Sequence, residues 1–186
     1  MTIGFDFDGV IFDMGPIIAH ELSKLLGRII TIQELTEHSI ENCFNLTKEQ
    51  TDYVVNCCYR DEYFWGDRFV PGARGGLKRM HSLNYPINII TARPHPERVR
   101  NYILSQIDIE PSLINVYYTR SKDKGPMAHD LGLTAFVDDH FVSLDSIAQY
   151  GIFPILFDNP WNQNPPAIYY HRIKSWGEIE EMILEL

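Results

Sequence analysis

The sequence predicts an α/β fold: a three-layer, Rossmann-like core with a mostly parallel sheet, and a small helical cap inserted after the first strand. Short apolar, β-branched stretches alternate with helical patterns, which is typical of a parallel sheet with crossover helices. Polar side chains suited to catalysis follow four of the predicted strands. A long interval between the first two of these segments predicts the inserted cap.

The first predicted strand, residues 1–7, ends in Asp6-Phe7-Asp8-Gly9. Residues i and i+2 of a strand leave the backbone on the same side, so Asp6 and Asp8 can face one crevice. Two carboxylates aimed at one point are costly unless a cation or a shared proton relieves them. The pair indicates a nucleophile beside a proton donor or a divalent-metal site, and this segment alone would also fit a surface turn.

Three further predicted strands are each followed by polar side chains. These are Thr91-Ala92-Arg93-Pro94 after residues 87–90, Lys122 and Lys124 after residues 114–118, and Asp138-Asp139-His140 after residues 135–137. In open parallel sheets, ligands bind outside the carboxyl ends of the strands. An acid pair, a hydroxyl, an ammonium and a second acid pair are therefore expected to meet at one edge of the sheet.

This combination resembles the haloacid dehalogenase superfamily of phosphohydrolases, whose motifs match Asp6-Phe7-Asp8-Gly9-Val10, Thr91, a lysine and Asp138-Asp139. The match spans most of the chain. Three further segments look like the 5'(3')-deoxyribonucleotidase branch and its bacterial and viral relatives: Val70-Pro71-Gly72-Ala73, the residues Ile89 to Pro94, and the residues Arg172 to Glu178.

The resemblance implies a role for each acid. Asp6 would be the nucleophile that forms an aspartyl phosphate, and Asp8 would protonate the leaving alcohol and then deprotonate the attacking water. Mg²⁺ is the expected cofactor, because it prefers oxygen ligands and bridges carboxylate to phosphate. Asp6 and Asp138 would bind it through their side chains and Asp8 through its carbonyl. Asp139 would lie behind these ligands, or it could exchange roles with Asp138.

The same resemblance suggests how the substrate is held. Thr91 and nearby backbone N–H groups, at Ala92 among others, would bind the transferring phosphoryl group. Lys124 would pair with that group and with Asp6, and Lys122 is the alternative lysine. Arg93 or His95 could reach a second anionic or ribose group, because arginine suits bidentate phosphate contacts.

Residues 14–69 are predicted to form the cap, and residues 1–13 and 70–186 the core. A strand, a crossover helix and a strand need about 30 residues, so roughly 50 are surplus between Asp8 and Thr91. Residues 16–26 read as a helix, and two capping boxes open further helices at Thr31 with Glu34 and at Thr47 with Gln50. Four aromatic residues near the end of the insert could stack on a nucleobase, Phe64 and Trp65 above all, or form the core of the cap: Tyr59, Tyr63, Phe64 and Trp65.

The later elements are predicted to stabilise the core. In order, they are a weak helix over residues 71–83 that contains Gly72, Gly75 and Gly76, a helix over residues 97–107, a fifth strand over residues 152–157, an Asn- and Pro-rich loop over residues 159–166, and a terminal helix capped by Ser175 and Glu178.

The bulk composition fits one compact enzyme. The chain has 186 residues, 45% of them apolar, and a net charge of −9, which disfavours binding to a nucleic-acid polymer. The three cysteines, Cys43, Cys57 and Cys58, lack the pairing and spacing of a disulfide framework or a zinc site, so a reducing cytoplasm is expected. No apolar run approaches the roughly 18 residues of a membrane span, and the first residues do not resemble a signal peptide.

The sequence therefore favours a Mg²⁺-dependent phosphatase that acts on a small phosphorylated metabolite, with (deoxy)ribonucleoside monophosphates as the expected substrates. A sugar-phosphate phosphatase or a phosphomutase with the same core is the alternative, and a non-catalytic binding protein is a third hypothesis. Oligomeric state is left open.

Overall fold

The computed structural model describes residues 2–120, 123–164 and 170–184. Its centre is a six-stranded sheet in the order β3-β2-β1-β4-β5-β6, and every strand pair is parallel. The strands are β1 (Ile3–Phe5), β2 (Ile87–Thr91), β3 (Ile114–Tyr118), β4 (Ala135–Asp138), β5 (Phe153–Phe157) and β6 (His171–Ile173). The predicted α/β fold with a parallel sheet is confirmed.

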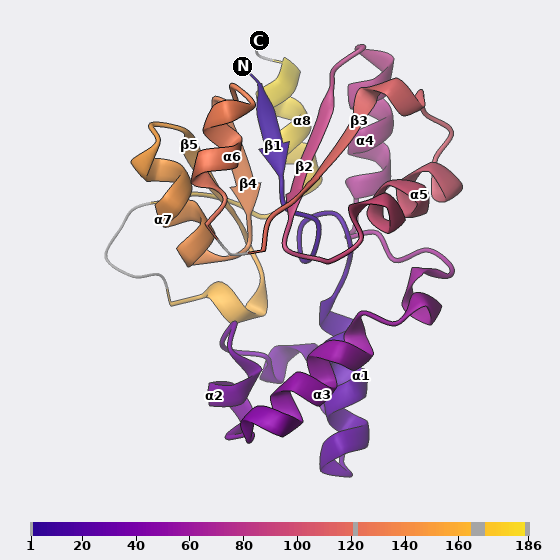
Figure 1. Cartoon of the computed structure of the whole chain (residues 1–186), viewed down its shortest axis with the longest axis vertical. Coiled ribbons are helices and arrows are strands. Elements are labelled where there is room, and N and C mark those ends of the chain that lie inside the picture. Colours follow the sequence, from indigo (N-terminus) through magenta and orange to yellow (C-terminus); the bar gives the residue numbers. More distant parts are fainter. Residues whose placement is uncertain (1, 121–122, 165–169, 185–186) are drawn as a thin grey trace.

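Helices cover both faces of the sheet and form the outer two of three layers (Figure 1). Neighbouring residues of one strand enter different hydrophobic clusters, as Ile89 and Ile90 do in β2 and Phe136 and Val137 do in β4. The larger cluster includes α4 (Ala73–Ser82), α5 (Pro96–Gln106) and α8 (Trp176–Leu184), and the smaller includes α6 (Gly125–Asp130) and α7 (Phe141–Gln149). Burial on both sides explains why neighbouring residues of these strands, such as Ile89 and Ile90, are both apolar instead of alternating with polar ones.

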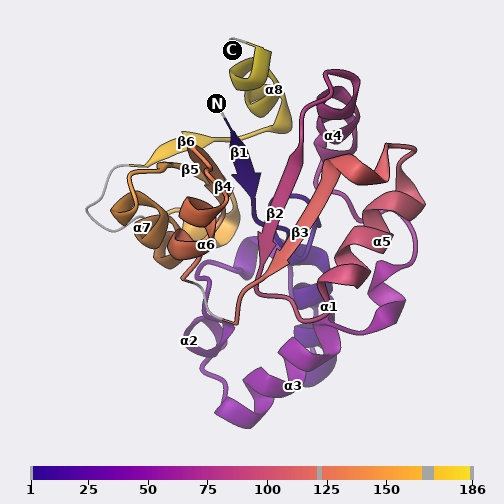
Figure 2. The same cartoon turned by 45° about the horizontal axis from the view of Figure 1, so that its top comes forward.

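The inserted segment lies beyond the carboxyl ends of the strands (Figure 1). It contains α1 (Gly15–Leu26), α2 (Ile40–Phe44), α3 (Lys48–Cys58) and the short 3-10 helices η1 (Ile32–Glu34) and η2 (Asp61–Phe64). The second view shows the same separation, with α8 and the start of β1 at the opposite end of the sheet (Figure 2). The insert is therefore placed to cover whatever the strand ends hold.

The two connections between insert and core run side by side. Phe12 and Phe69 form an antiparallel bridge, the Asp13 N–H donates to the Arg68 carbonyl at 2.7 Å, and the Val70 N–H donates to the Ile11 carbonyl at 2.9 Å. The entry and exit of the insert are thus fixed to one another at the edge of the core.

The predicted capping residues are found at their helix ends. Thr47 and Gln50 form a reciprocal capping box at the start of α3, and Thr31 and Glu34 form another at η1. The Glu178 N–H donates to the Ser175 hydroxyl at 3.4 Å just before α8. These polar pairs supply partners for helix N–H groups that have none within the helix.

The structure has one strand more than the five that the sequence predicts. β6 pairs with β5 through Ile155 and His171, Leu156 and Arg172, and Phe157 and Ile173. Its three residues are too short and too polar to show a strand pattern. An ion pair between Arg172 and Asp158 at its start holds it beside β5, and such a long-range contact is not visible in sequence.

No helix among the described residues is long and apolar enough to cross a membrane. Two further 3-10 helices complete the described elements, η3 (Pro111–Leu113) before β3 and η4 (Pro160–Asn162) after β5.

The glycines of α4 make room for one large ring. The Trp176 side chain is fully buried, stacks on Phe5 at 5.3 Å between ring centroids, and donates its indole N–H to the Val10 carbonyl at 2.8 Å. A Cβ atom at Gly76 would lie 2.3 Å from Cε3 of Trp176, whereas one at Gly75 would meet nothing within 4 Å. Gly76 is therefore needed for packing, and Gly75 is not.

We expect Gly76→Ala to lower the free energy of unfolding by about 1–3 kcal/mol, because a buried indole has no space to yield. The matched control in the same helix, Gly75→Ala, should be neutral or stabilise by up to about 1 kcal/mol through helix propensity. Urea denaturation of the two variants measures the difference. Equal effects at both positions would contradict the packing argument.

Candidate active site

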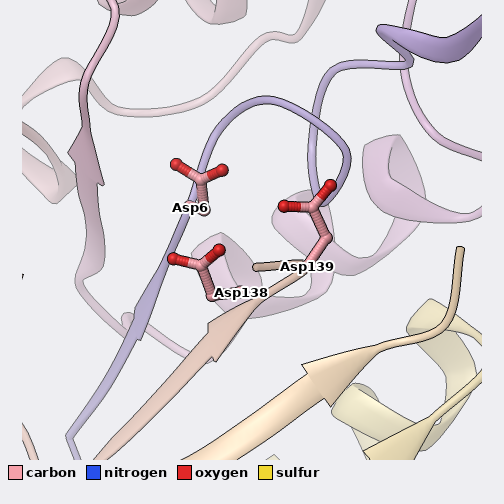
Figure 3. Close-up of side chains that lie close together, drawn as sticks. All are labelled: Asp6, Asp138 and Asp139. Carbon is pink, nitrogen blue, oxygen red and sulfur yellow. The ribbon is translucent and has the colours of Figure 1, made fainter. Parts of the chain in front are cut away.

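Three aspartates meet where β1 and β4 end. Asp6 directly follows β1, Asp138 is the last residue of β4, and Asp139 comes next in the chain. Figure 3 shows the three carboxylates close together, and each offers an oxygen within 4.8 Å of the others. All three residues are buried. Because β1 and β4 are parallel neighbours, two segments far apart in sequence deliver acids to the same point.

Lys124 places a positive charge inside this cluster. It precedes α6, is buried, and its Nζ donates to Asp6 Oδ1 at 2.6 Å and to Asp138 Oδ2 at 2.7 Å. Burial alone disfavours an ammonium, but the two carboxylates raise the pKa of Lys124 above its ordinary value, so it stays charged. The alternative, Lys122, lies outside the described residues.

The carboxyl groups are strained electrostatically. Burial, together with the charges of Asp138 and Asp8, raises the pKa of Asp6 to about 7 although Lys124 opposes the shift. Burial and the neighbouring acids Asp138 and Asp6 also raise the pKa of Asp139 well above its ordinary value. Three carboxylates against one ammonium leave excess negative charge, which a divalent cation would relieve.

The donor set fits Mg²⁺. The three converging groups offer oxygen atoms, which Mg²⁺ prefers, and among the described residues no cysteine or histidine belongs to this cluster. Asp6, Asp138 and Asp139 could hold the ion through their side chains. Asp8 was expected to contribute its backbone carbonyl, and its side chain pairs with Arg93 and does not belong to this cluster.

Asp8 is paired with Arg93. Arg93 donates from Nε to Asp8 Oδ2 at 3.2 Å and from Nη2 to Asp8 Oδ1 at 2.6 Å. The sequence predicts Arg93 as a substrate ligand, but both of these donors are engaged by a protein carboxylate. The side chain is 2% exposed, so the arginine borders the cavity as a buried support for Asp8.

Thr91 and Ala92, the residues expected to bind a phosphoryl group, lie at the end of β2. Thr91 ends β2, is buried, and accepts the Arg93 N–H at 3.0 Å through Oγ1. Ala92 follows it, and both line the cavity that contains Asp6 and Lys124. His95, by contrast, lies at the exposed start of α5, with Nδ1 3.2 Å from a carboxylate oxygen of Glu97.

The acidic cluster forms the floor of a cavity of about 220 Å³. The inserted segment supplies a mostly apolar roof from α1, α2, α3 and the residues around them. The roof residues are Met14, Ile18, Leu35, Ile40, Val54, Val55, Cys58 and Tyr59, with Glu37 and His38 at one side.

The two rings expected to contact a base lie elsewhere. Trp65 is 75% exposed and does not line the cavity, and Phe64 packs against Phe7, Phe12 and Tyr102 in the core. Trp65 follows η2, which turns its ring outward, whereas Phe64 fills space under the insert. Tyr59, from the same cluster, is the aromatic residue that reaches the cavity.

Trp161 and its neighbours support the site and were missed from sequence. Trp161 lines the cavity, and its indole N–H donates to Asp139 Oδ2 at 2.8 Å. Asn162 donates to the Asp139 carbonyl at 2.9 Å, and Asn159 donates to the Gly9 carbonyl at 3.0 Å. The loop after β5 was expected only to stabilise the core. Its position at the carboxyl end of a parallel strand was the available signal.

Gly9 gives the Asp-Phe-Asp-Gly segment its turn. It has φ +79°, and a Cβ atom there would lie 2.1 Å from Asp139 Oδ2. The residue must therefore be glycine for two independent reasons, one conformational and one steric. It lets the loop after β1 pass directly over the second acid pair.

These features define the class of protein: an α/β chain with an acidic, lysine-bridged site at its strand ends and a helical insert above it. Similar folds include a predicted phosphoglycolate phosphatase from Haemophilus somnus, with a TM-score of 0.65 and 16% identity over 98% of this chain and 97% of that one. For a haloacid dehalogenase-like hydrolase from Streptococcus pneumoniae, the TM-score is 0.63 and the identity 16%, with 98% of this chain and 97% of that one covered. For β-phosphoglucomutase from Clostridium difficile, the TM-score is 0.56 and the identity 17%, with 99% of this chain and 95% of that one covered. The chain has the haloacid dehalogenase-like fold.

One protein is also similar in sequence along nearly the whole chain. It is the Bacillus subtilis (strain 168) protein named "Putative nucleotidase YqfW", which is 24% identical over 183 residues, 96% of this chain and 91% of that protein. No family model matches the chain.

We expect Gly9→Ala to weaken Mg²⁺ binding by about 10–100-fold, because the new methyl group would displace the Asp139 carboxylate. Gly27→Ala is the matched control: Gly27 has φ +65° and a Cβ atom there would meet nothing within 4 Å, so it carries the backbone strain alone. Isothermal titration with Mg²⁺ measures both variants. Equal Mg²⁺ affinity in Gly9→Ala and wild type would show that Asp139 does not contribute to the site.

We also expect Mg²⁺ affinity to fall by about tenfold per pH unit below pH ~7, because the proton on Asp6 must leave before its carboxylate can bind a cation. The stability of the metal-free protein should change with pH in the opposite direction to the Mg²⁺ affinity. A raised pKa in the folded state stabilises the metal-free protein below about pH 4, and this stabilisation is lost as the pH rises to about 7. Titrations at several pH values measure the first effect and thermal melts the second. Asp6→Asn should reduce this pH dependence of stability, with the part due to Asp139 remaining. A pH-independent Mg²⁺ affinity would contradict the prediction.

Proposed function

We propose that this protein is a Mg²⁺-dependent phosphatase that hydrolyses nucleoside monophosphates through an aspartyl phosphate on Asp6. The observation that carries the proposal is the placement of Asp6 at the floor of the cavity, held by Lys124 beside two further buried acids. A buried carboxylate next to an ammonium and a candidate metal site is the arrangement that a nucleophile for phosphate esters needs.

In the first step, an Asp6 oxygen attacks phosphorus while the bond to the leaving alcohol oxygen breaks, and Asp8 supplies the proton that this oxygen requires. In the second step, water attacks the phosphorus of the aspartyl phosphate, Asp8 takes up a proton, and Asp6 is released. The ammonium of Lys124 and the donors around Thr91 would stabilise the charge on the transferring group. Bound Mg²⁺ would supply further positive charge for the phosphate oxygens.

The roof of the cavity favours a leaving group that carries a flat ring. Its aliphatic side chains and the ring of Tyr59 can contact a nucleobase, whereas most of them offer no partner to the hydroxyl groups of a sugar. A hydroxyl group that is buried without a hydrogen bond costs about 1–3 kcal/mol. The name of the Bacillus subtilis relative points to the same substrate class.

A sugar-phosphate phosphatase or phosphomutase is the second candidate, because one structural neighbour is named a β-phosphoglucomutase. That similarity concerns the fold alone, and the apolar roof of the cavity argues against a sugar-phosphate substrate. A non-catalytic role fits less well with four charged residues gathered at one point.

We further propose that residues 14–69 act as a cap that closes over the substrate, hinged at the paired connections near Asp13 and Val70. The three free cysteines suit a reducing compartment, so we place the enzyme in the cytoplasm. The acidic chain would act on small phosphorylated metabolites and not on nucleic-acid polymers.

The proposal is tested by assaying a panel of ribo- and deoxyribonucleoside monophosphates, sugar phosphates and p-nitrophenyl phosphate, each with Mg²⁺ and with EDTA. We expect Mg²⁺-dependent phosphate release, with the highest kcat/KM on a nucleotide. Sugar phosphates outrunning every nucleotide would remove the nucleotidase assignment, and no turnover of any substrate would remove the phosphatase.

We expect Asp6→Asn to lower kcat on every substrate by a factor on the order of 10³ or more, because an amide cannot act as the nucleophile. Asp130→Asn, an exposed change on α6, is the control and should retain activity. Circular dichroism would verify that both variants fold. Substantial turnover by Asp6→Asn would exclude the covalent route.

A further inference from the structure

Arg93 holds Asp8 with more geometric precision than a simple ion pair requires. Two of its nitrogen atoms donate to the two oxygen atoms of one carboxylate, at 3.2 and 2.6 Å. A fork of this kind fixes the plane of the carboxylate as well as its position, which a lysine ammonium cannot do. The side chain of Asp8 remains 23% exposed and lines the cavity, so its orientation matters where a substrate would bind.

The guanidinium lies in a cage of four aromatic rings. Its Cζ atom is 5.6 Å from the ring centroid of Phe7, 5.0 Å from that of Phe12, and 4.8 Å from those of both Tyr59 and Phe64. Its third nitrogen, Nη1, is buried with no hydrogen-bond partner among the described residues. Attraction between the ring faces and the cation offsets part of the cost of burying it.

The cage is built from both sides of the hinge. Phe7 and Phe12 belong to the loop after β1, whereas Tyr59 and Phe64 belong to the end of the inserted segment. Arg93 Nη2 also lies 3.8 Å from the sulfur of Met14, which directly precedes α1. The arginine that orients Asp8 is therefore held partly by the insert.

We propose that Arg93 is the positioning residue for Asp8, and that Tyr59 and Phe64 make this positioning depend on the seating of the insert against the core. The inference rests on the proposed function, because it concerns proton transfer to and from the leaving and attacking oxygens. Arg93 acts through Asp8. When the insert packs against the core, Tyr59 and Phe64 complete the cage and fix the guanidinium. The Asp8 carboxylate is then directed into the cavity.

The test compares Arg93→Lys and Arg93→Met, which fills the same cage without charge, on a nucleoside monophosphate and on p-nitrophenyl phosphate. On the nucleotide, we expect kcat to fall about 10–100-fold while KM changes less than about threefold, because an alkoxide leaving group depends on a well-placed proton donor. The loss on the aryl phosphate should be several-fold smaller, because its leaving group needs little protonation. Arg98→Lys, which alters an exposed ion pair with Asp61 of the insert, is the matched control and should retain wild-type kinetics.

A double-mutant cycle separates positioning from other roles. If Arg93 acts through Asp8, adding Arg93→Lys or Arg93→Met to Asp8→Asn should cause little further loss, less than about threefold. Losses that multiply, or a rise in KM on both substrates with kcat unchanged, would assign Arg93 to substrate binding and overturn the proposal. Unchanged kcat in folded Arg93→Met would overturn it as well.

The contribution of the insert is tested at Phe64, whose ring does not line the cavity. Phe64→Leu should lower kcat on the nucleotide several-fold, and this loss should disappear in the Asp8→Asn background. Phe44→Leu removes a partly buried ring of α2 that neither lines the cavity nor belongs to the cage, and it should leave kcat unchanged. Equal effects of the two substitutions would exclude a specific coupling through the cage. The activity of the wild-type protein on the substrate panel is the reference for all variants. If the wild-type protein is active but the double mutants show multiplied losses, this inference is wrong and the proposed function still stands.

Discussion

The contact on which the rest of the structure depends is the bridge from Lys124 to Asp6 and Asp138. It joins the loop after β1, the end of β4 and the start of α6 in one buried ionic contact. Removing Lys124 would leave two buried carboxyl groups without their cation, which typically costs several kcal/mol. The chain is closely packed around this bridge. Gly125, directly after the lysine, leaves no room for a Cβ because the Ser146 carbonyl oxygen would lie 2.5 Å away.

A second set of contacts holds Asp139 in place beside that bridge. Trp161, Asn162 and Gly9 surround it from the loop after β5 and the loop after β1. The indole hydrogen bond fixes one carboxylate oxygen, and the asparagine fixes the backbone. The three acids are therefore held in place by contacts from two different loops as well as by Lys124.

Much of this could be predicted from sequence because it follows from strand geometry. Parallel strands bring Asp6, Thr91, Lys124 and Asp138 to the same edge, although β1 ends at Phe5 and the strand spacing expected for Asp6 and Asp8 does not apply. What could not be predicted depends on side-chain direction in irregular segments. No local pattern shows that Arg93 turns inward to Asp8, or that Tyr59 reaches the cavity while Trp65 points to solvent.

The paired connections at Asp13 and Val70 have a consequence for how such a protein diversifies. Because the two ends of the insert are already hydrogen-bonded to one another on the core, the segment between them can be lengthened, shortened or exchanged without moving a strand of the sheet. Mutation can then reshape the roof of the cavity while the acids below keep their positions. The cage around Arg93 limits this freedom, because two of its rings, Tyr59 and Phe64, come from the insert.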